Sequence, residues 1–263
     1  MRVPAGAQSD THRGNPGNFG PVRPEDITPE TVRPVRRPTM TQRWADLAFL
    51  HWPADPDVIG RRLPAGTVPD VLDGVTYVGL IAFRMADTAL LGGPRVPYLG
   101  TFCETNVRLY SVDGAGRRGV VFLSLDAERL VPVLLGRAAL RLPYMWSRMR
   151  LTRDGDVLTY TARRRPGRTV RSRLRIRAGR PIPDPTPLEH FLTARWGLHT
   201  RGWGRTLHLP NEHPSWPLQR AELIDLDDTL LAAAGLPPGG APVSVLYSPG
   251  VPAAFGNPDM VRN

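Results

Sequence analysis

Short apolar runs separated by turn residues recur along most of this chain. Residues 75–85 (VTYVGLIAFRM) and 119–126 (GVVFLSLD) are apolar at consecutive positions, which is typical of strands covered on both faces. A strand is also expected at 101–110, and the sequence DGAG at 113–116 is typical of a tight hairpin turn. The strands on either side of this turn are therefore predicted to pair antiparallel.

Helical spacing is found in fewer places. Apolar residues at positions 44, 47, 48 and 50 predict a helix at 44–50, which ends before Trp52-Pro53. A second stripe predicts a helix at 130–138, with its proline confined to the first turn. Short helices are expected near 188–195 and 227–234, the latter with an aspartate at its N-cap.

A second group of strands is predicted over residues 144–177. Its last strand alternates strictly, so that one face is arginine and the other is apolar or small. The arginine face comprises Arg171, Arg173, Arg175 and Arg177. Further strands are expected at 216–223 and 243–247, which leaves the fold rich in strands and poor in helices.

The domain organisation follows from composition. Residues 1–40 are rich in Pro, Gly, Arg and Thr and poor in large apolar residues, which predicts a disordered tail. Residues 41–255 are expected to form a single domain, and 256–263 a flexible tail. Many short strands at close spacing predict a mainly β (α+β) fold, built as a closed antiparallel barrel with a few short helices.

The single cysteine, Cys103, excludes an intrachain disulfide and suits a reducing compartment. No apolar run approaches the length of a membrane span, and the N-terminus has no apolar core typical of a secretory signal. We therefore expect a cytoplasmic protein without a membrane partner.

The net charge of +10 is concentrated in one place. All 34 basic residues are arginine, and nine of them lie between Arg163 and Arg180, where no acidic residue occurs. Such a block suits the binding of nucleic acid or another polyanion. The alternative is a solvated strand face, because arginine is the only basic residue that this chain uses and the block has no aromatic residue for base stacking.

The strand at 101–110 carries the most specific polar pattern. One face presents Phe102, Glu104, Asn106, Arg108 and Tyr110, with neighbours roughly 7 Å apart. In a pocket, Arg108 suits a substrate carboxylate, and Glu104 suits a general acid or base once burial raises its pKa. Asn106 would orient either group. The competing interpretation is the solvated face of a half-buried strand.

Four motifs in this order resemble one family. They are FLHW (49–52), ETNVRLY (104–110), GVVFLSLD (119–126) and GRAALRLPY (136–144), and together they span most of the chain after residue 40. They resemble the YqjF-like family of unknown function (DUF2071), which is related to acetoacetate decarboxylase. The resemblance implies an acetoacetate decarboxylase-like barrel with an interior pocket, lined in part by the strand that holds Glu104. It implies no particular reaction.

The chain departs from the decarboxylase where that enzyme has its catalytic lysine. That lysine forms a Schiff base with the keto acid, and the stretch 141–145 (RLPYM) resembles its surroundings, with Tyr144 at its place. Since the chain contains no lysine, a lysine imine is excluded. Tyr144 is then either a proton donor or a packing residue. Arg137 either reaches the same pocket, pairs with a carboxylate such as Asp126, or lies in solvent.

Other chemistries find little support in the sequence. His199, His208 and His213 fit no compact zinc motif and are expected in a loop, so no metal is predicted. His51 is interpreted as a packing residue. No phosphate-binding loop or nucleophile elbow is present, so no cofactor is predicted either.

The predicted function is therefore the binding of a small, anionic organic acid in an interior pocket. Glu104 and Tyr144 are the candidate catalytic residues, and Phe102, Asn106, Arg108, Tyr110 and Arg137 are the candidate ligand contacts. Whether the protein is an enzyme stays open; as one it would be a cofactor-free lyase or hydrolase. The alternative is nucleic-acid or polyanion binding through the Arg163–Arg180 hairpin, and a homo-oligomer is left open.

Overall fold

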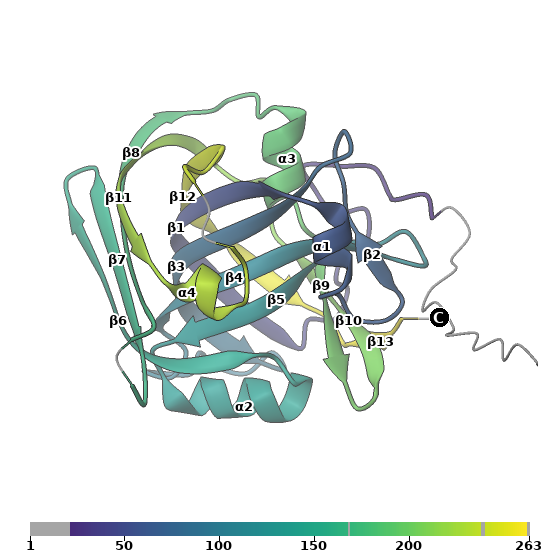
Figure 1. The fold of residues 1–263 in the computed structure, drawn as a ribbon. Helices are drawn as coiled ribbons and strands as arrows, with labels where there is room; N and C mark the ends of the chain where they lie inside the picture. Colours follow the sequence, from purple (N-terminus) through teal and green to yellow (C-terminus); the bar gives the residue numbers. More distant parts are fainter. Residues whose placement is uncertain (1–21, 168, 238–239, 262–263) are drawn as a thin grey trace, which may run out of the picture.

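Nine strands close into a ring in the computed structural model, which describes residues 22–167, 169–237 and 240–261 (Figure 1). Around the ring the order is β5-β6-β7-β8-β11-β12-β1-β3-β4, and β4 pairs with β5 again. The ring strands are β1 (Met40–Ala54), β3 (Thr76–Leu90), β4 (Phe102–Asp113), β5 (Arg118–Ala127), β6 (Tyr144–Asp154), β7 (Val157–Arg164), β8 (Arg171–Pro181), β11 (Gln219–Asp228) and β12 (Ser244–Phe255). The predicted closed barrel is confirmed.

The centre of the sheet contains the predicted hairpin of β4 and β5. β3 lies between β1 and β4 and is buried along most of its length, as its unbroken apolar run predicts. β4 and β5 pair antiparallel across the turn, where Gly116 adopts a positive φ of 80°. The short edge strand β2 (Thr67–Pro69) pairs with the end of β4.

One pairing in the nine-strand ring is parallel, so the ring is mixed where an antiparallel one was expected. Helix α2 (Leu130–Leu140) carries the chain from the end of β5 back to the start of β6, and the two strands pair parallel. A crossover of this kind places a helix between parallel neighbours. β5 also pairs parallel with β9 (Gly197–Gly202) through Val120 and Leu198.

A second, smaller ring shares β12, β1, β3, β4 and β5 with the first. Its closing strands are β9 and β10 (Arg205–Glu212), which bridge β5 to β12. The sequence predicted a loop here, around His199 and His208. That prediction was wrong, because the two histidines face each other as strand partners and the flanking prolines had obscured a regular hairpin.

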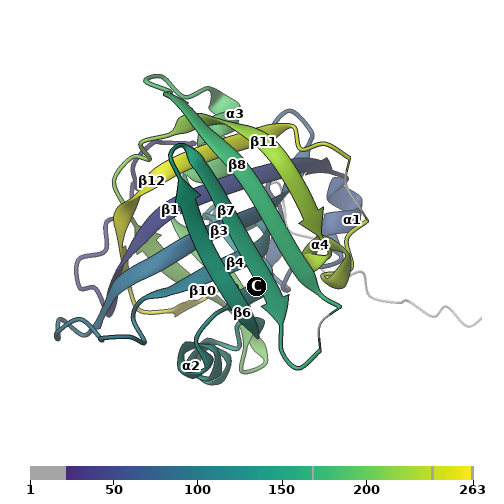
Figure 2. The ribbon, with the colours of Figure 1, turned by 90° about the vertical axis from the view of Figure 1, so that its left-hand side faces the viewer.

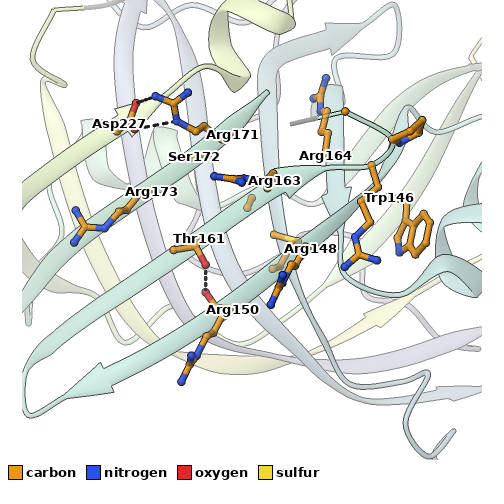
Figure 3. Close-up of a pocket in the computed structure, with 15 residues that line it drawn as sticks. Trp146, Arg148, Arg150, Thr161, Arg163, Arg164, Arg171, Ser172, Arg173 and Asp227 are labelled. Carbon is orange, nitrogen blue, oxygen red and sulfur yellow. Dashed lines mark hydrogen bonds and ion pairs between the residues drawn. The ribbon is translucent and has the colours of Figure 1, made fainter. Parts of the chain in front are cut away.

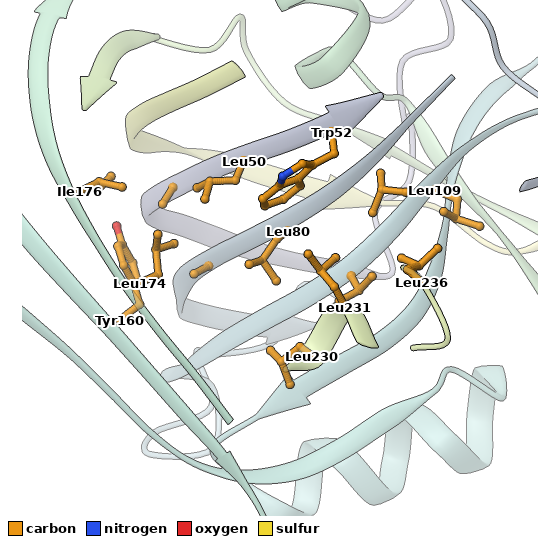
Figure 4. Close-up of a cluster of buried hydrophobic side chains, with 14 of the residues drawn as sticks. Leu50, Trp52, Leu80, Leu109, Tyr160, Leu174, Ile176, Leu230, Leu231 and Leu236 are labelled. Atoms are coloured by element: carbon orange, nitrogen blue, oxygen red, sulfur yellow. The ribbon is translucent and has the colours of Figure 1, made fainter. Parts of the chain in front are cut away.

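The interior of the nine-strand ring is packed with apolar side chains (Figure 4). They come from strands all around the ring and include Leu50, Leu80, Val107, Leu158, Leu174 and Tyr247. Helices α1 (Pro56–Gly60) and α4 (Leu230–Ala233) contribute further residues to the same cluster. This filled core stabilises the ring through buried apolar area.

The helix predicted at 44–50 is wrong, because these residues belong to β1. Asp46 has a positive φ of 51°, and the register with β3 shifts between Ala45 and Ala48, which marks a bulge. The bulge places Leu47 and Ala48 on opposite faces, and both are buried. Burial on both faces together with the inserted residue produces an apolar spacing that resembles a helix.

The other predicted helices are present. α2 and α4 occupy the expected positions, and α3 (Pro187–Thr193) begins with a capping box between Thr186 and Glu189. The N-cap of α4 is Thr229, while the Asp228 carboxylate accepts a hydrogen bond from the amide of Leu231.

The chain on either side of the ring makes specific contacts. Residues 22–39 form no strand, but the Glu25 carboxylate accepts a hydrogen bond from the amide of Arg118, and Ile27 packs against a buried cluster. Near the C-terminus, β13 (Asp259–Met260) pairs with β10. Residues 1–21 lie outside the described residues, and the predicted domain boundaries stay a prediction. No helix in the described ranges is long and apolar enough to cross a membrane.

Candidate functional site

The polar row of β4 faces away from the filled interior of the nine-strand ring. Val107 and Leu109 point into that interior, whereas Phe102 and Tyr110, from the alternate face, pack in the clusters on the other side of the sheet. The row is therefore enclosed by the second ring and α3. An interior pocket of the nine-strand ring, which the resemblance implied, does not contain these residues, because strand alternation directs them to the opposite face.

Glu104 is buried in apolar surroundings, with only 3% of its surface exposed. Its strand neighbours are Phe83 on β3 and Ala127 on β5, and the Tyr144 hydroxyl donates a hydrogen bond to Oε2 at 3.2 Å. Burial raises the pKa of Glu104 to about 7, although hydrogen bonds from Tyr144 and Asn106 oppose the shift. A carboxyl group with such a pKa exchanges its proton near neutral pH, as an acid–base catalyst requires.

Tyr144 is held at the start of β6 by the end of α2. Arg141 closes the helix in the left-handed conformation, and Gly136 faces the tyrosine ring so closely that a Cβ there would lie 2.5 Å from Cε2. Burial, then the charge of Glu104, raises the pKa of Tyr144 well above its usual value. The phenol therefore keeps its proton and serves as a donor to Glu104.

Arg137 lies at the surface beside Tyr144. Its Nε donates to the backbone carbonyl of Tyr144 at 2.6 Å, and one terminal nitrogen approaches the sulfur of Met145 at 3.7 Å. The structure thus places Arg137 against the backbone that carries Tyr144. Its predicted contact with a ligand stays a prediction.

Arg108 is half-buried, and within the described part of the chain its guanidinium donates hydrogen bonds to uncharged acceptors. Its guanidinium donates to the Tyr110 hydroxyl at 3.2 and 3.1 Å and to the carbonyl of Leu192 at 2.8 Å. It lies 5.8 Å from the centroid of the Phe49 ring. Among the residues that the structure describes, no carboxylate lies within ion-pair distance of it, so its charge is available to an anion.

His51 belongs to this site, although the sequence marked it only as a packing residue. Cross-strand register aligns His51, Gly79 and Arg108 on β1, β3 and β4, and a side chain at Gly79 would crowd both neighbours. Nε2 of His51 lies 2.8 Å from the Tyr110 hydroxyl. Burial, then Arg108 and Arg195, lowers the pKa of His51 well below its usual value, so the ring is neutral.

Two buried polar atoms at the site have no hydrogen-bond partner among the described residues. They are Nδ1 of His51 and Oδ1 of Asn106. Buried polar atoms are usually paired, so unpaired ones beside an arginine free of ion pairs suggest a place where a ligand or water completes the network.

A groove of about 900 Å³ lies outside the polar row of β4, whose residues do not line it. It is bordered by residues 30–34, by β1, and by the end of β10, and it reaches His213. The His213 ring lies among Trp44, Trp196 and Trp216, with centroid distances of 5.7, 4.5 and 4.6 Å. Burial lowers the pKa of His213 to about 4, and the charge of Arg108 contributes to the shift.

The sequence did not predict the part played by His213 or Trp216. Both lie in the connection between β10 and β11, more than 100 residues after Arg108 in the chain, and no local pattern links them to it. The indole nitrogen of Trp216 donates to the carbonyl of Thr193 at 2.9 Å, which ties this connection to α3.

Two other candidate chemistries are not supported by the geometry. Burial, then Glu128, raises the pKa of the Cys103 thiol to about 11, so it stays protonated, and it points away from Glu104. Within the described ranges, no group of three His, Cys, Asp or Glu side chains gathers in a way that would hold a metal ion.

Comparison with known proteins identifies the family. A model of DUF2071, described as an uncharacterized conserved protein, matches residues 41–252. This chain belongs to the DUF2071 family. The uncharacterized protein YqjF of Bacillus subtilis (strain 168) is 29% identical over 202 residues, which cover 75% of this chain and 82% of YqjF.

Solved structures share the fold of this DUF2071 protein at low sequence identity. The acetoacetate decarboxylase of Legionella pneumophila has a TM-score of 0.56 at 16% identity, covering 99% of this chain and 98% of that one. The enduracididine biosynthesis enzyme MppR, complexed with pyruvate, has a TM-score of 0.57 at 15% identity, covering 86% and 91%. These similarities show an acetoacetate decarboxylase-like fold.

Proposed function

We propose that this DUF2071 protein binds a small organic carboxylate at the site formed by Arg108, Asn106, Glu104 and Tyr144. The observation that carries the proposal is the half-buried guanidinium of Arg108, which has neutral hydrogen-bond partners but no carboxylate partner in the described part of the chain. Removing an anion from water is costly unless a fixed cation receives it, and a guanidinium receives a carboxylate with two parallel hydrogen bonds.

The ligand is expected to be longer than a three-carbon acid if it reaches Glu104. Glu104 and Arg108 are four residues apart on one strand, about 13 Å between Cα atoms. Asn106 lies between them with an unpaired Oδ1, which suits a hydroxyl or amide group of the ligand. The complex of MppR with pyruvate supports a keto acid as the class to test first, since that enzyme has the same fold.

The chemistry that suits this site is proton transfer between the ligand and Glu104. A pKa of about 7 lets the carboxyl group give and take a proton near neutral pH, and Tyr144 holds it in place with a hydrogen bond. A lysine imine is excluded because the chain has no lysine. We further expect that the ligand enters through the groove at His213. We also expect that the protein is located in the cytoplasm.

Substitution of Arg108 tests the binding site. In calorimetric titration with pyruvate, acetoacetate and 2-oxoglutarate, at least one acid should bind the intact protein. Arg108→Gln should weaken that binding about 10- to 100-fold, because a charge-assisted hydrogen bond contributes about 1.5–3 kcal/mol. Circular dichroism would establish that the variant is folded.

The matched control is Arg201→Gln, which removes one exposed arginine on β9 and should leave the affinity unchanged. Failure of all three acids to bind the intact protein would contradict the proposal. Equal affinity of folded Arg108→Gln and the intact protein would contradict the role of Arg108.

A further inference from the structure

A second region with uncompensated positive charge lies on the outer face of β6, β7 and β8, on the side of the ring that Figure 2 brings to the front. A groove of about 980 Å³ follows these strands (Figure 3). Four exposed arginines line it: Arg148 and Arg150 on β6, Arg163 on β7, and Arg165 in the turn after β7. It is separate from the site of Arg108, which is buried under the second ring.

The strand register forces like charges together in this groove. Arg148 on β6 is directly opposite Arg163 on β7, and Arg163 is directly opposite Arg171 on β8. Like charges at directly opposite positions destabilise a sheet. A bound anion would offset this repulsion.

Acidic neighbours limit the charged region on one side. Arg171 pairs with Asp227 on β11 at 3.1 Å, and Arg173 pairs with Asp225. Carboxylates on β11 therefore pair with Arg171, Arg173 and Arg177, three of the four arginines on the β8 face that the sequence singled out. This pairing was not visible in the sequence, because the block itself contains no acidic residue.

Arg164 also lines the groove, but its charge is directed inward. Its guanidinium forms two hydrogen bonds of 2.9 Å with the buried carboxylate of Asp126. The four exposed arginines have no carboxylate partner among the described residues. Arg168, which follows the turn after β7, lies outside the described residues. The available charge is thus a compact cluster of four, to which β6 contributes two arginines from outside the predicted Arg163–Arg180 block.

We propose that this groove binds a compact ligand with two or three linked phosphate groups. Neighbouring strands lie about 4.8 Å apart and alternate residues of a strand about 7 Å apart, so the cluster matches an anion with several charges in a short length. Asp227 lines the groove on its β11 side and would repel a long polyanion that extended in that direction. The indole of Trp146, 5.0 Å from the guanidinium carbon of Arg165, borders the groove.

Titration of the full chain with inorganic tripolyphosphate tests the proposal. The triple variant Arg148→Gln, Arg150→Gln, Arg163→Gln should bind at least 30-fold more weakly than the intact protein. A control triple variant, Arg36→Gln, Arg37→Gln, Arg201→Gln, loses the same charge at exposed positions elsewhere and should change the affinity less than threefold. Binding should also weaken steeply with salt, because the contacts are ionic.

Two further titrations distinguish the sources of phosphate, and a third tests independence from the carboxylate site. Orthophosphate should bind at least tenfold more weakly than tripolyphosphate, and a 12-nucleotide oligothymidylate should bind no more tightly. Arg108→Gln should leave tripolyphosphate binding unchanged, so this test is independent of the proposed carboxylate site.

Several results would overturn the proposal. They are the absence of tripolyphosphate binding at low salt, equal losses in the two triple variants, and equal affinity for orthophosphate. Tighter binding of the oligothymidylate that is lost in the first triple variant would assign the groove to single-stranded nucleic acid instead.

Discussion

At the scale of single residues, the environment of Glu104 determines the chemistry of the site. Its neighbours in the sheet are Phe83 and Ala127, so the ionised carboxylate loses most of its hydration. Among the described residues, the neutral donors of Tyr144 and Asn106 compensate in part for this loss. Alternation in the sequence placed Glu104 on a face with Arg108, but the depth of burial that shifts its pKa depends on strands far away in the chain.

The raised pKa of Glu104 predicts a pH-dependent loss of stability. The folded state favours the protonated carboxyl, with a pKa of about 7, whereas the unfolded chain ionises near 4.5. Stability is therefore lost as the pH rises from about 4.5 to about 7, by an amount on the order of 3 kcal/mol. Glu104→Gln removes the ionisation and should raise the free energy of unfolding at pH 8 by a similar amount, with little change at pH 4.5.

Urea denaturation at the two pH values measures this difference. Glu222→Gln, at an exposed glutamate of β11, is the matched control and should show a change below about 1 kcal/mol at both. A Glu104→Gln effect that is the same at pH 4.5 and pH 8 would show that the carboxyl ionises normally in the fold.

At the scale of elements, the parallel junction between β5 and β6 closes the nine-strand ring. Asp126 on β5 receives two hydrogen bonds of 2.9 Å from Arg164 on β7 and one of 2.7 Å from the hydroxyl of Ser147 on β6. Its carboxylate therefore joins three strands at the point where only three residue pairs connect β5 with β6. The sequence suggested Arg137 as a partner for Asp126, but Arg164 fills that position.

Breaking this junction should be costly. Asp126→Asn leaves the guanidinium of Arg164 largely buried without its counter-charge, and we expect a loss of about 3–5 kcal/mol in the free energy of unfolding. Asp225→Asn breaks an exposed pair with Arg173 and should cost less than about 1 kcal/mol. Equal losses in the two variants, measured by urea denaturation, would contradict a special role for the junction.

At the scale of the whole molecule, two rings share one set of strands, and the chain before β1 packs against the smaller one. Ile27 joins the cluster that contains Tyr110 and Phe191, and the amide of Val35 donates to the Glu212 carboxylate at 2.6 Å. These contacts connect residues 22–39 to the walls of the candidate site.

A comparison of two truncated chains tests the domain boundary. A chain that begins at residue 41 should be less stable than one that begins at residue 22, by about 2 kcal/mol or more, because it loses the burial of Ile27 and the hydrogen bonds of Glu25. Urea midpoints of the two chains provide the measurement. Identical midpoints would instead support the boundary at residue 41 that composition predicts.

The sequence by itself determined the features that depend on neighbouring residues. Apolar runs located β3 and β5, the glycine-rich turn specified the antiparallel hairpin of β4 and β5, and alternation separated the polar face of β4 from its apolar face. The absence of lysine excluded a lysine imine without reference to any structure. Each of these conclusions follows from side-chain direction or chemistry over a few residues.

Only the tertiary structure decided which surfaces those faces meet. Residues 44–50 belong to strand β1, and the bulge at Asp46 explains why their apolar spacing resembles that of a helix. Closure through β9 and β10 buries the Glu104 row under a second ring. Arg171 and Arg173 of β8 form ion pairs with aspartates of β11, some 50 residues later in the chain. Pairing between distant segments depends on the free energy of the whole packed molecule, and no local pattern in the sequence encodes it.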